Sequence, residues 1–108
     1  MQLKPGTLLQ NGEYKIIKVL GQGGFGITYL AEQTSLRRKV AIKEFFMKEY
    51  CERDKETSSV SLGTSGSKEL VDKFRDKFVK EAHNIESFNH KNIIRIHDVF
   101  YENNTAYY

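Results

Sequence analysis

Residues Gly21-Gln22-Gly23-Gly24-Phe25-Gly26 place four glycines between two segments rich in β-branched and aromatic residues. The flanking segments, 14–20 and 27–32, have the length and composition of strands, so the glycine-rich stretch predicts the turn of a β-hairpin. Because glycine has no Cβ, the backbone N–H groups of such a turn can approach an anion closely. The sequence therefore predicts a hairpin whose loop is a candidate anion-binding site.

A third β-like segment, 39–45, contains Val40-Ala41-Ile42-Lys43. Successive side chains of a strand point to opposite faces, so Ala41 and Lys43 share one face while Val40 and Ile42 share the other. Lys43 adds a mobile positive charge close to the glycine-rich turn, and the small Ala41 leaves room beside it for a flat ligand. Together the turn and Lys43 predict a cradle for the phosphates of a nucleotide.

Residues 69–88 carry a helical pattern, with apolar residues spaced three and four apart. These residues are Val71, Phe74, Phe78, Ala82, Ile85 and Phe88. Glu81 lies beside Ala82, on or near the apolar stripe. A buried carboxylate needs a partner because burying an unpaired charge is costly, and Lys43 is the candidate. The alternative is a solvated glutamate at the edge of the stripe.

Between the third strand and the helix, residues 48–68 are rich in Ser, Thr, Gly and charged residues, which predicts a mobile loop with a short β segment at Val60-Ser61-Leu62. After the helix, residues 93–101 predict a fourth strand, Glu102-Asn103-Asn104 a turn, and 105–108 the start of a fifth strand. The expected fold is α+β, with a five-stranded antiparallel sheet packed against one long helix. Because the sequence stops inside a β-like run, we expect it to be a piece of a longer protein.

Composition narrows the class of protein. A chain of 108 residues fits one small domain, and its net charge of +3 comes from 17 basic and 14 acidic residues that are interleaved. This mixed surface argues against nucleic-acid binding. Cys51 is the one cysteine, so it can form no intrachain disulfide, and we expect an unreactive intracellular thiol.

Targeting signals are not visible in the sequence. The segment 1–6 has no apolar signal-peptide core. No run reaches the roughly 20 apolar residues that a membrane-spanning helix needs. We therefore expect a cytoplasmic location and no membrane contact from this segment.

The order of these parts resembles the amino-terminal lobe of a protein kinase. Gly21, Gly23 and Gly26 occupy the three glycine positions of that family's loop, Phe25 lies at its tip, and 40–43 match the family's Val-Ala-Ile-Lys strand. Phe78-Val79-Lys80-Glu81-Ala82 resembles the segment that carries the family's helix glutamate, and His90-Lys91-Asn92-Ile93-Ile94 is similar to its His-Pro-Asn-Ile turn. Residues 27–31 and 43–46 are similar to bacterial serine/threonine kinases. The resemblance covers residues 14–108.

The resemblance implies that the parent protein transfers the γ-phosphoryl group of ATP, with Mg²⁺, to a serine or threonine hydroxyl of a protein substrate. Lys43 would hold the α- and β-phosphates and Glu81 would orient Lys43, which makes these two the expected catalytic residues. The expected nucleotide-binding residues are Leu20, Gly21, Gln22, Gly23, Gly24, Phe25, Gly26, Thr28, Ala41 and Lys43. For the apolar residues among them, ordinary core packing is the alternative.

The chain also departs from the family. Thr28 replaces the usual valine under the adenine, and Lys91 replaces the proline of the turn. The segment from Lys43 to Glu81 is longer than in most kinases, so 48–68 is interpreted as an insertion, for which a regulatory or docking role is a hypothesis.

The family's His-Arg-Asp, Asp-Phe-Gly and Ala-Pro-Glu motifs are absent from the sequence. We therefore expect residues 1–108 to be an amino-terminal lobe without the carboxy-terminal lobe and its Mg²⁺ ligands, inactive alone and with weak or undetectable affinity for ATP. The surface that would face the missing lobe is expected to favour a homo-oligomer.

Two other functions fit parts of the pattern. A free-standing lobe could act as a protein-interaction module without catalysis. A Gly-x-Gly-x-x-Gly stretch also marks dinucleotide-binding enzymes, but that fold opens a helix directly after the glycines, where this sequence continues with a β-like segment.

Overall fold

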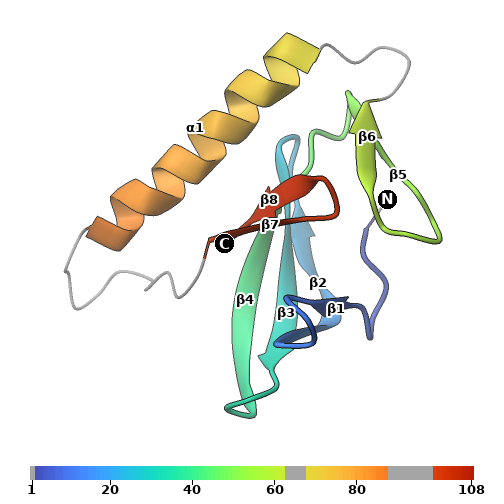
Figure 1. Ribbon diagram of the computed structural model, residues 1–108, viewed down its shortest axis with the longest axis vertical. Coiled ribbons are helices and arrows are strands. Elements are labelled where there is room, and N and C mark those ends of the chain that lie inside the picture. The colour runs from blue at the N-terminus through green and yellow to red at the C-terminus, as the bar shows by residue number, and fades with distance from the viewer. Residues whose placement is uncertain (1, 63–67, 88–98) are drawn as a thin grey trace.

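The computed structural model describes residues 2–62, 68–87 and 99–108. Figure 1 shows one long helix lying along a twisted antiparallel sheet, with a small separate hairpin at one end. In chain order the elements are β1 (Leu8–Leu9), β2 (Tyr14–Gln22), β3 (Gly26–Gln33), β4 (Arg38–Phe45), β5 (Cys51–Arg53), β6 (Val60–Leu62), α1 (Lys68–Ser87), β7 (Phe100–Glu102) and β8 (Thr105–Tyr107). The fold is therefore α+β, as expected.

The main sheet has six strands in the order β1-β2-β3-β4-β8-β7, rather than the five expected. The additional strand is β1, which pairs Leu8 with Lys15 and Leu9 with Tyr14. A two-residue strand is too short to show an alternating pattern, so this pairing depends on tertiary contacts. Of the expected fourth strand, the structure describes only residues 99–101, of which Phe100 and Tyr101 belong to β7, and the rest lies outside the described residues.

Strands β2, β3 and β4 form a continuous meander close to the expected bounds. Tyr29 on β3 is fully buried and Ile42 on β4 is 3% exposed, and the two are directly paired. On the other face of β4, Ala41 is exposed and Lys43 is half-buried. The alternation predicted for residues 40–43 is thus confirmed, and Lys43 lies on the open face of the sheet.

Helix α1 covers the end of the sheet near β8 (Figure 1). Its buried residues include Phe78, whose ring lies 5.6 Å from that of Phe45 and 4.7 Å from that of Tyr108. Val71 and Ala82, from the same apolar stripe, are buried as well. The stripe therefore faces the sheet as predicted, whereas Phe88 and the side chain of Ile85 lie outside the described residues. No helix in the described ranges is long and apolar enough to cross a membrane.

Within 48–62 the chain forms a hairpin of β5 and β6 instead of an irregular loop. Strand β6 coincides with the predicted segment at 60–62, but its partner β5 was not predicted because Cys51-Glu52-Arg53 has little strand character by itself. Cys51 and Val60 join the hydrophobic core. Burial raises the pKa of the Cys51 thiol, which favours its unreactive protonated form.

Candidate functional site

The glycine-rich loop is a tight continuation of the β2–β3 hairpin. Gly21 still pairs with Thr28, and the N–H of Gly23 donates to the carbonyl oxygen of Gly26 at 2.9 Å. A Cβ placed on Gly21, Gly23 or Gly24 would meet no atom within 4 Å, so the space over the loop is open. At Gly26, however, a Cβ would lie 3.0 Å from the carbonyl oxygen of Glu44. Glycine at position 26 is therefore required by the close approach of β3 to β4.

The tip of the loop is held against the residues that follow β4. The N–H of Phe46 donates to the carbonyl oxygen of Phe25 at 3.0 Å, and the N–H of Lys48 donates to that of Gly24 at 3.2 Å. The ring of Phe25 lies 5.0 Å from the ring of Phe74 on α1. The loop tip thus contacts both the end of β4 and the helix.

Lys43 lies where β4 is paired on both sides. It is opposite Thr28 on β3, and its backbone N–H and carbonyl bond the carbonyl and N–H of Tyr108 at 2.7 and 2.9 Å. Its Nζ is 5.8 Å from the centre of the Tyr108 ring. The main chain of Lys43 is therefore fixed between two neighbours, while its ammonium group faces the loop and the helix.

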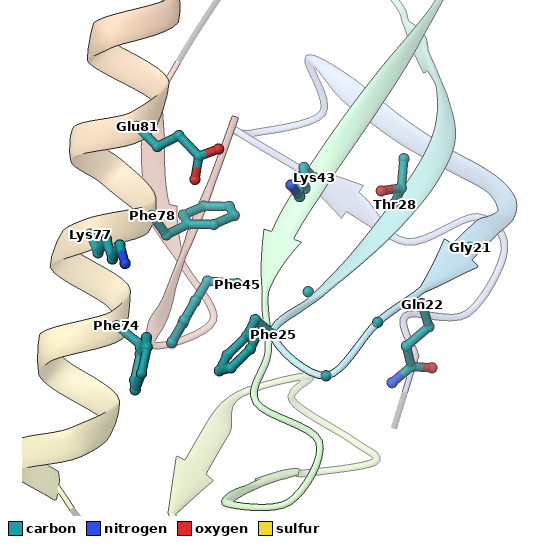
Figure 2. A pocket seen from close by; sticks show the side chains of 13 residues that line it. Gly21, Gln22, Phe25, Thr28, Lys43, Phe45, Phe74, Lys77, Phe78 and Glu81 are labelled. Atoms are coloured by element: carbon teal, nitrogen blue, oxygen red, sulfur yellow. The ribbon is translucent and has the colours of Figure 1, made fainter.

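A cavity of about 510 Å³ lies among the glycine-rich loop, β4 and α1 (Figure 2). Its size falls within the range of small-molecule sites, roughly 300–1,000 Å³. It is lined by Gly21, Gln22, Gly23, Gly24, Phe25, Gly26, Thr28, Lys43, Phe45, Phe74, Lys77, Phe78 and Glu81. Glycines, aromatic rings and three charged side chains thus surround one space.

Most of the expected site residues line this cavity, and two do not. Gly21 to Gly26, Thr28, Lys43 and Glu81 are brought together from the β2–β3 hairpin, strand β4 and the more distant helix α1. Leu20 is 54% exposed and Ala41 is exposed, and both lie outside the cavity lining.

The structure adds Phe45, Phe74, Lys77 and Phe78 to the site. The apolar stripe that places Phe74 and Phe78 on the inner face of the helix was visible in the sequence. Lys77 could have been found from its spacing, because it lies one helical turn before Glu81.

Glu81 is exposed, and its side chain points from α1 towards the cavity (Figure 2). It forms no ion pair with Lys43 in the described part of the chain. Of the two interpretations of Glu81, the solvated carboxylate at the edge of the helix stripe matches the structure. Water solvates this charge, so the partner that a buried carboxylate would need is not required.

The arrangement suits an anionic ligand that also has an apolar part. Lys43 and Lys77 supply positive charge, the open glycine backbone allows close approach, and the phenylalanine rings give an apolar wall. Glu81 adds a carboxylate that can approach a lysine if the side chains move.

The fold is like that of the amino-terminal lobe of protein kinases. In structure, the chain is similar to the apo form of PpkA-294, with a TM-score of 0.90 and 29% identity over 98% of this chain and 37% of that one. In sequence, it is 31% identical to the serine/threonine-protein kinase PrkC of Bacillus subtilis over 90% of this chain, and 29% identical to PknD of Protochlamydia amoebophila over 95%. The chain therefore forms a domain like the amino-terminal lobe of bacterial serine/threonine protein kinases.

The matched region is a small part of these relatives. The chain spans 12% of the length of PrkC and 9% of PknD. A shorter stretch of 41 residues is 51% identical to the serine/threonine-protein kinase pkn2 of Myxococcus xanthus and spans 5% of it. No protein-family model matches the chain.

Proposed function

We propose that this chain is the ATP-binding lobe of a serine/threonine protein kinase, and that the whole protein transfers the γ-phosphoryl group of ATP to hydroxyl groups of a protein substrate. The observation that carries the proposal is the convergence of the glycine-rich loop, Lys43 and Glu81 on one cavity (Figure 2). Core packing alone does not require these three parts to share a space.

Phosphoryl transfer depends mainly on positioning and on stabilising charge, and the chain's residues suit both tasks. The backbone of 21–26 would cover the phosphates, since the space over three of its glycines is open. Lys43, whose side chain lies beside Gly26, would bind the α- and β-phosphates. Leu20, Thr28 and Ala41 would contact one side of the adenine.

Glu81 would orient Lys43 in the nucleotide-bound state. The two side chains line the same cavity without forming an ion pair, so this role requires the side chains, or α1 as a whole, to move closer. An ion pair there would hold the lysine ammonium at one point, which favours a fixed phosphate geometry.

By itself the chain is proposed to be inactive, with weak affinity for ATP. No group of three or more His, Cys, Asp or Glu side chains in the described ranges is placed to hold a metal ion. The Mg²⁺ that accompanies ATP would be held by residues of the carboxy-terminal lobe, which would also supply the catalytic base.

Nuclear magnetic resonance of the ¹⁵N-labelled chain tests the nucleotide site. Adding ADP should shift the amide signals of residues 21–26 and of Lys43, and Lys43→Met should abolish these shifts. Lys39→Met, which changes an exposed lysine of the same strand, should leave them unchanged. Shifts located away from the cavity, or shifts that persist in Lys43→Met, would contradict the proposal. Phosphorylation of a generic protein substrate by the purified chain would contradict its inactivity.

A further inference from the structure

Glu44, the residue after Lys43, is a fully buried carboxylate. Its side chain lies on the core face of β4 and accepts hydrogen bonds from the hydroxyl groups of Tyr29, at 2.8 Å, and Tyr107, at 2.5 Å. It also forms an ion pair with the guanidinium group of Arg53. Burial of an ionised carboxylate is tolerated only when it is paired and hydrogen-bonded, so these contacts are a condition for the local fold.

Arg53 reaches Glu44 from the hairpin β5–β6. Its side chain is 4% exposed, its Nη1 donates to the carbonyl oxygen of Ser58 at 2.8 Å, and its guanidinium lies 5.2 Å from the centre of the Phe46 ring. The arginine is therefore embedded in its own hairpin and in the segment that follows β4. The hairpin thereby supplies the cation that Glu44 needs inside the core.

The same network joins β8 to β4 at Lys43. The sheet register between these strands is the single pair Glu44 and Tyr107, and the backbone of Lys43 bonds that of Tyr108. The Tyr107 hydroxyl group connects the Glu44 carboxylate to the side-chain amide of Asn103. Because the strand pairing is so short, the side-chain bond between Tyr107 and Glu44 adds to the connection between β4 and β8, as does the bond from the Thr105 hydroxyl group to the carbonyl oxygen of Phe45 at 2.6 Å.

A second contact ties the hairpin to the β7–β8 turn. The N–H of Val60 donates to the carbonyl oxygen of Asn103 at 2.7 Å, and the amide of Asn104 donates to the carbonyl oxygen of Val60 at 2.8 Å. The hairpin thus touches β8 through the turn and β4 through Arg53. It therefore contacts both β4, which contains Lys43, and the β7–β8 hairpin, which leads to Tyr108, the residue that bonds the main chain of Lys43.

We propose that hairpin β5–β6 braces the phosphate site and that Arg53 is a positioning residue for Lys43, acting through Glu44 and Tyr107. The importance of Lys43 in this inference rests on the proposed function. Neither Arg53 nor Glu44 lines the cavity, so their effect on a ligand passes through the position of β4. The contact between the hairpin and Glu44 thus holds Lys43 in position, and loss of that contact would let Lys43 move.

The first test is hydrogen exchange of the 108-residue chain with Arg53→Met, which leaves Glu44 buried without its cation. Exchange of the Lys43 and Tyr108 amides should accelerate by about tenfold or more, while amides of the β2–β3 hairpin keep their protection. Arg38→Met, an exposed arginine on β4, is the control and should leave both groups unchanged. An unchanged exchange rate of the Lys43 amide in Arg53→Met would contradict the proposed role of the hairpin.

Two further variants keep the test decisive if Arg53→Met does not fold. Glu44→Gln combined with Arg53→Met removes both charges, and should restore slow exchange at Lys43 because no charge is left unpaired. Tyr107→Phe removes one hydroxyl group from the network and should accelerate exchange in the same direction to a smaller extent. If amides throughout the double variant exchange fast, as in a globally destabilised chain, the result would count against the proposal.

Titration with ADP tests the positioning role of Arg53 and the proposed nucleotide site independently. At a temperature where each variant is folded by circular dichroism, Arg53→Met should lower the affinity for ADP by roughly fivefold, and Arg38→Met should not change it. In one outcome, the unsubstituted chain shows no ADP-induced shift while Arg53→Met still accelerates exchange of the Lys43 amide. That result would support the positioning role of Arg53 and contradict the proposed nucleotide site. If ADP binds and Arg53→Met behaves like Arg38→Met in both measurements, the brace fails and the nucleotide site stands.

Discussion

The ring of Phe25, at the tip of the glycine-rich loop, lies 5.0 Å from the ring of Phe74 on helix α1. This contact joins a loop that is otherwise open on its cavity side to the helix that carries Glu81. Phe25 remains 55% exposed, so its ring makes a surface contact, whereas Phe74 is half-buried and packs against the core. The loop tip and α1 can therefore separate without unfolding the sheet.

Phe25→Ala should loosen the loop tip with little effect on overall stability. Because the Phe25 ring is largely solvated, the loss in the free energy of unfolding should be about 1 kcal/mol or less. Hydrogen exchange at Phe46 and Lys48, whose N–H groups bond the carbonyl oxygens of the loop, should accelerate. Urea denaturation measures the change in the free energy of unfolding. A stability loss as large as that of a core substitution would show that the pair is structural.

Gly26→Ala should destabilise the chain, because its Cβ would lie 3.0 Å from the backbone oxygen of Glu44. Backbone atoms of a paired strand cannot move aside easily, so we expect a loss of about 1–3 kcal/mol in the free energy of unfolding. Gly24→Ala is the matched control, since its Cβ would meet nothing within 4 Å, and it should change stability by about 0.5 kcal/mol or less. Equal effects of the two substitutions in urea denaturation would refute this explanation of Gly26.

Stability should decrease at alkaline pH through Tyr29 and Tyr107. Burial, and then the charge of Glu44, raises the pKa of both phenols above the ordinary value of 10.0. A group whose pKa is raised in the folded state contributes stability that is fully present below its pKa in the unfolded chain and is lost as the pH rises above it. The free energy of unfolding should therefore fall as the pH rises above about 10.

Urea denaturation across this alkaline range measures the loss, and the phenolate absorbance follows the titration. Tyr107→Phe should make the decline shallower, because only one of the two buried phenols remains. The exposed Tyr101 provides the control, and Tyr101→Phe should leave the slope unchanged. A pH-independent free energy of unfolding would contradict the burial of these phenols.

The open face of the sheet should make the chain self-associate at high concentration. Leu20 is 54% exposed, and the exposed Ala41 lies on the same open side as Lys43. Exposed apolar patches promote association, so light scattering should report species larger than a monomer, and Leu20→Asp should shift the population towards monomer. Leu36→Asp, at a 60% exposed leucine in the β3–β4 turn, should not. A monomer at every concentration would disprove the expected homo-oligomer.

The periodicity of apolar residues was sufficient to predict the long strands and the helix. The alternation in 40–43 predicted correctly which side of β4 carries Lys43, since a strand has no other way to arrange its side chains. The helical spacing around Phe78 likewise predicted the buried face of α1. Strand β1 and strand β5 were missed because two or three residues carry too little periodicity, and their pairing is stabilised only by partners distant in the sequence.

The sequence by itself determined the elements that the site is built from: a glycine-rich hairpin turn, a lysine on the open face of the next strand, and a helix with Glu81 at the edge of its apolar stripe. Only the tertiary structure decided that Glu81 stays solvated without pairing with Lys43, and that Glu44, the residue after Lys43, is buried. The physical reason is that a charge can be buried only beside a partner, and the partner of Glu44 is Arg53, which comes from a separate hairpin. Local periodicity records which face a residue occupies, but it carries no information about which distant side chain will meet it there.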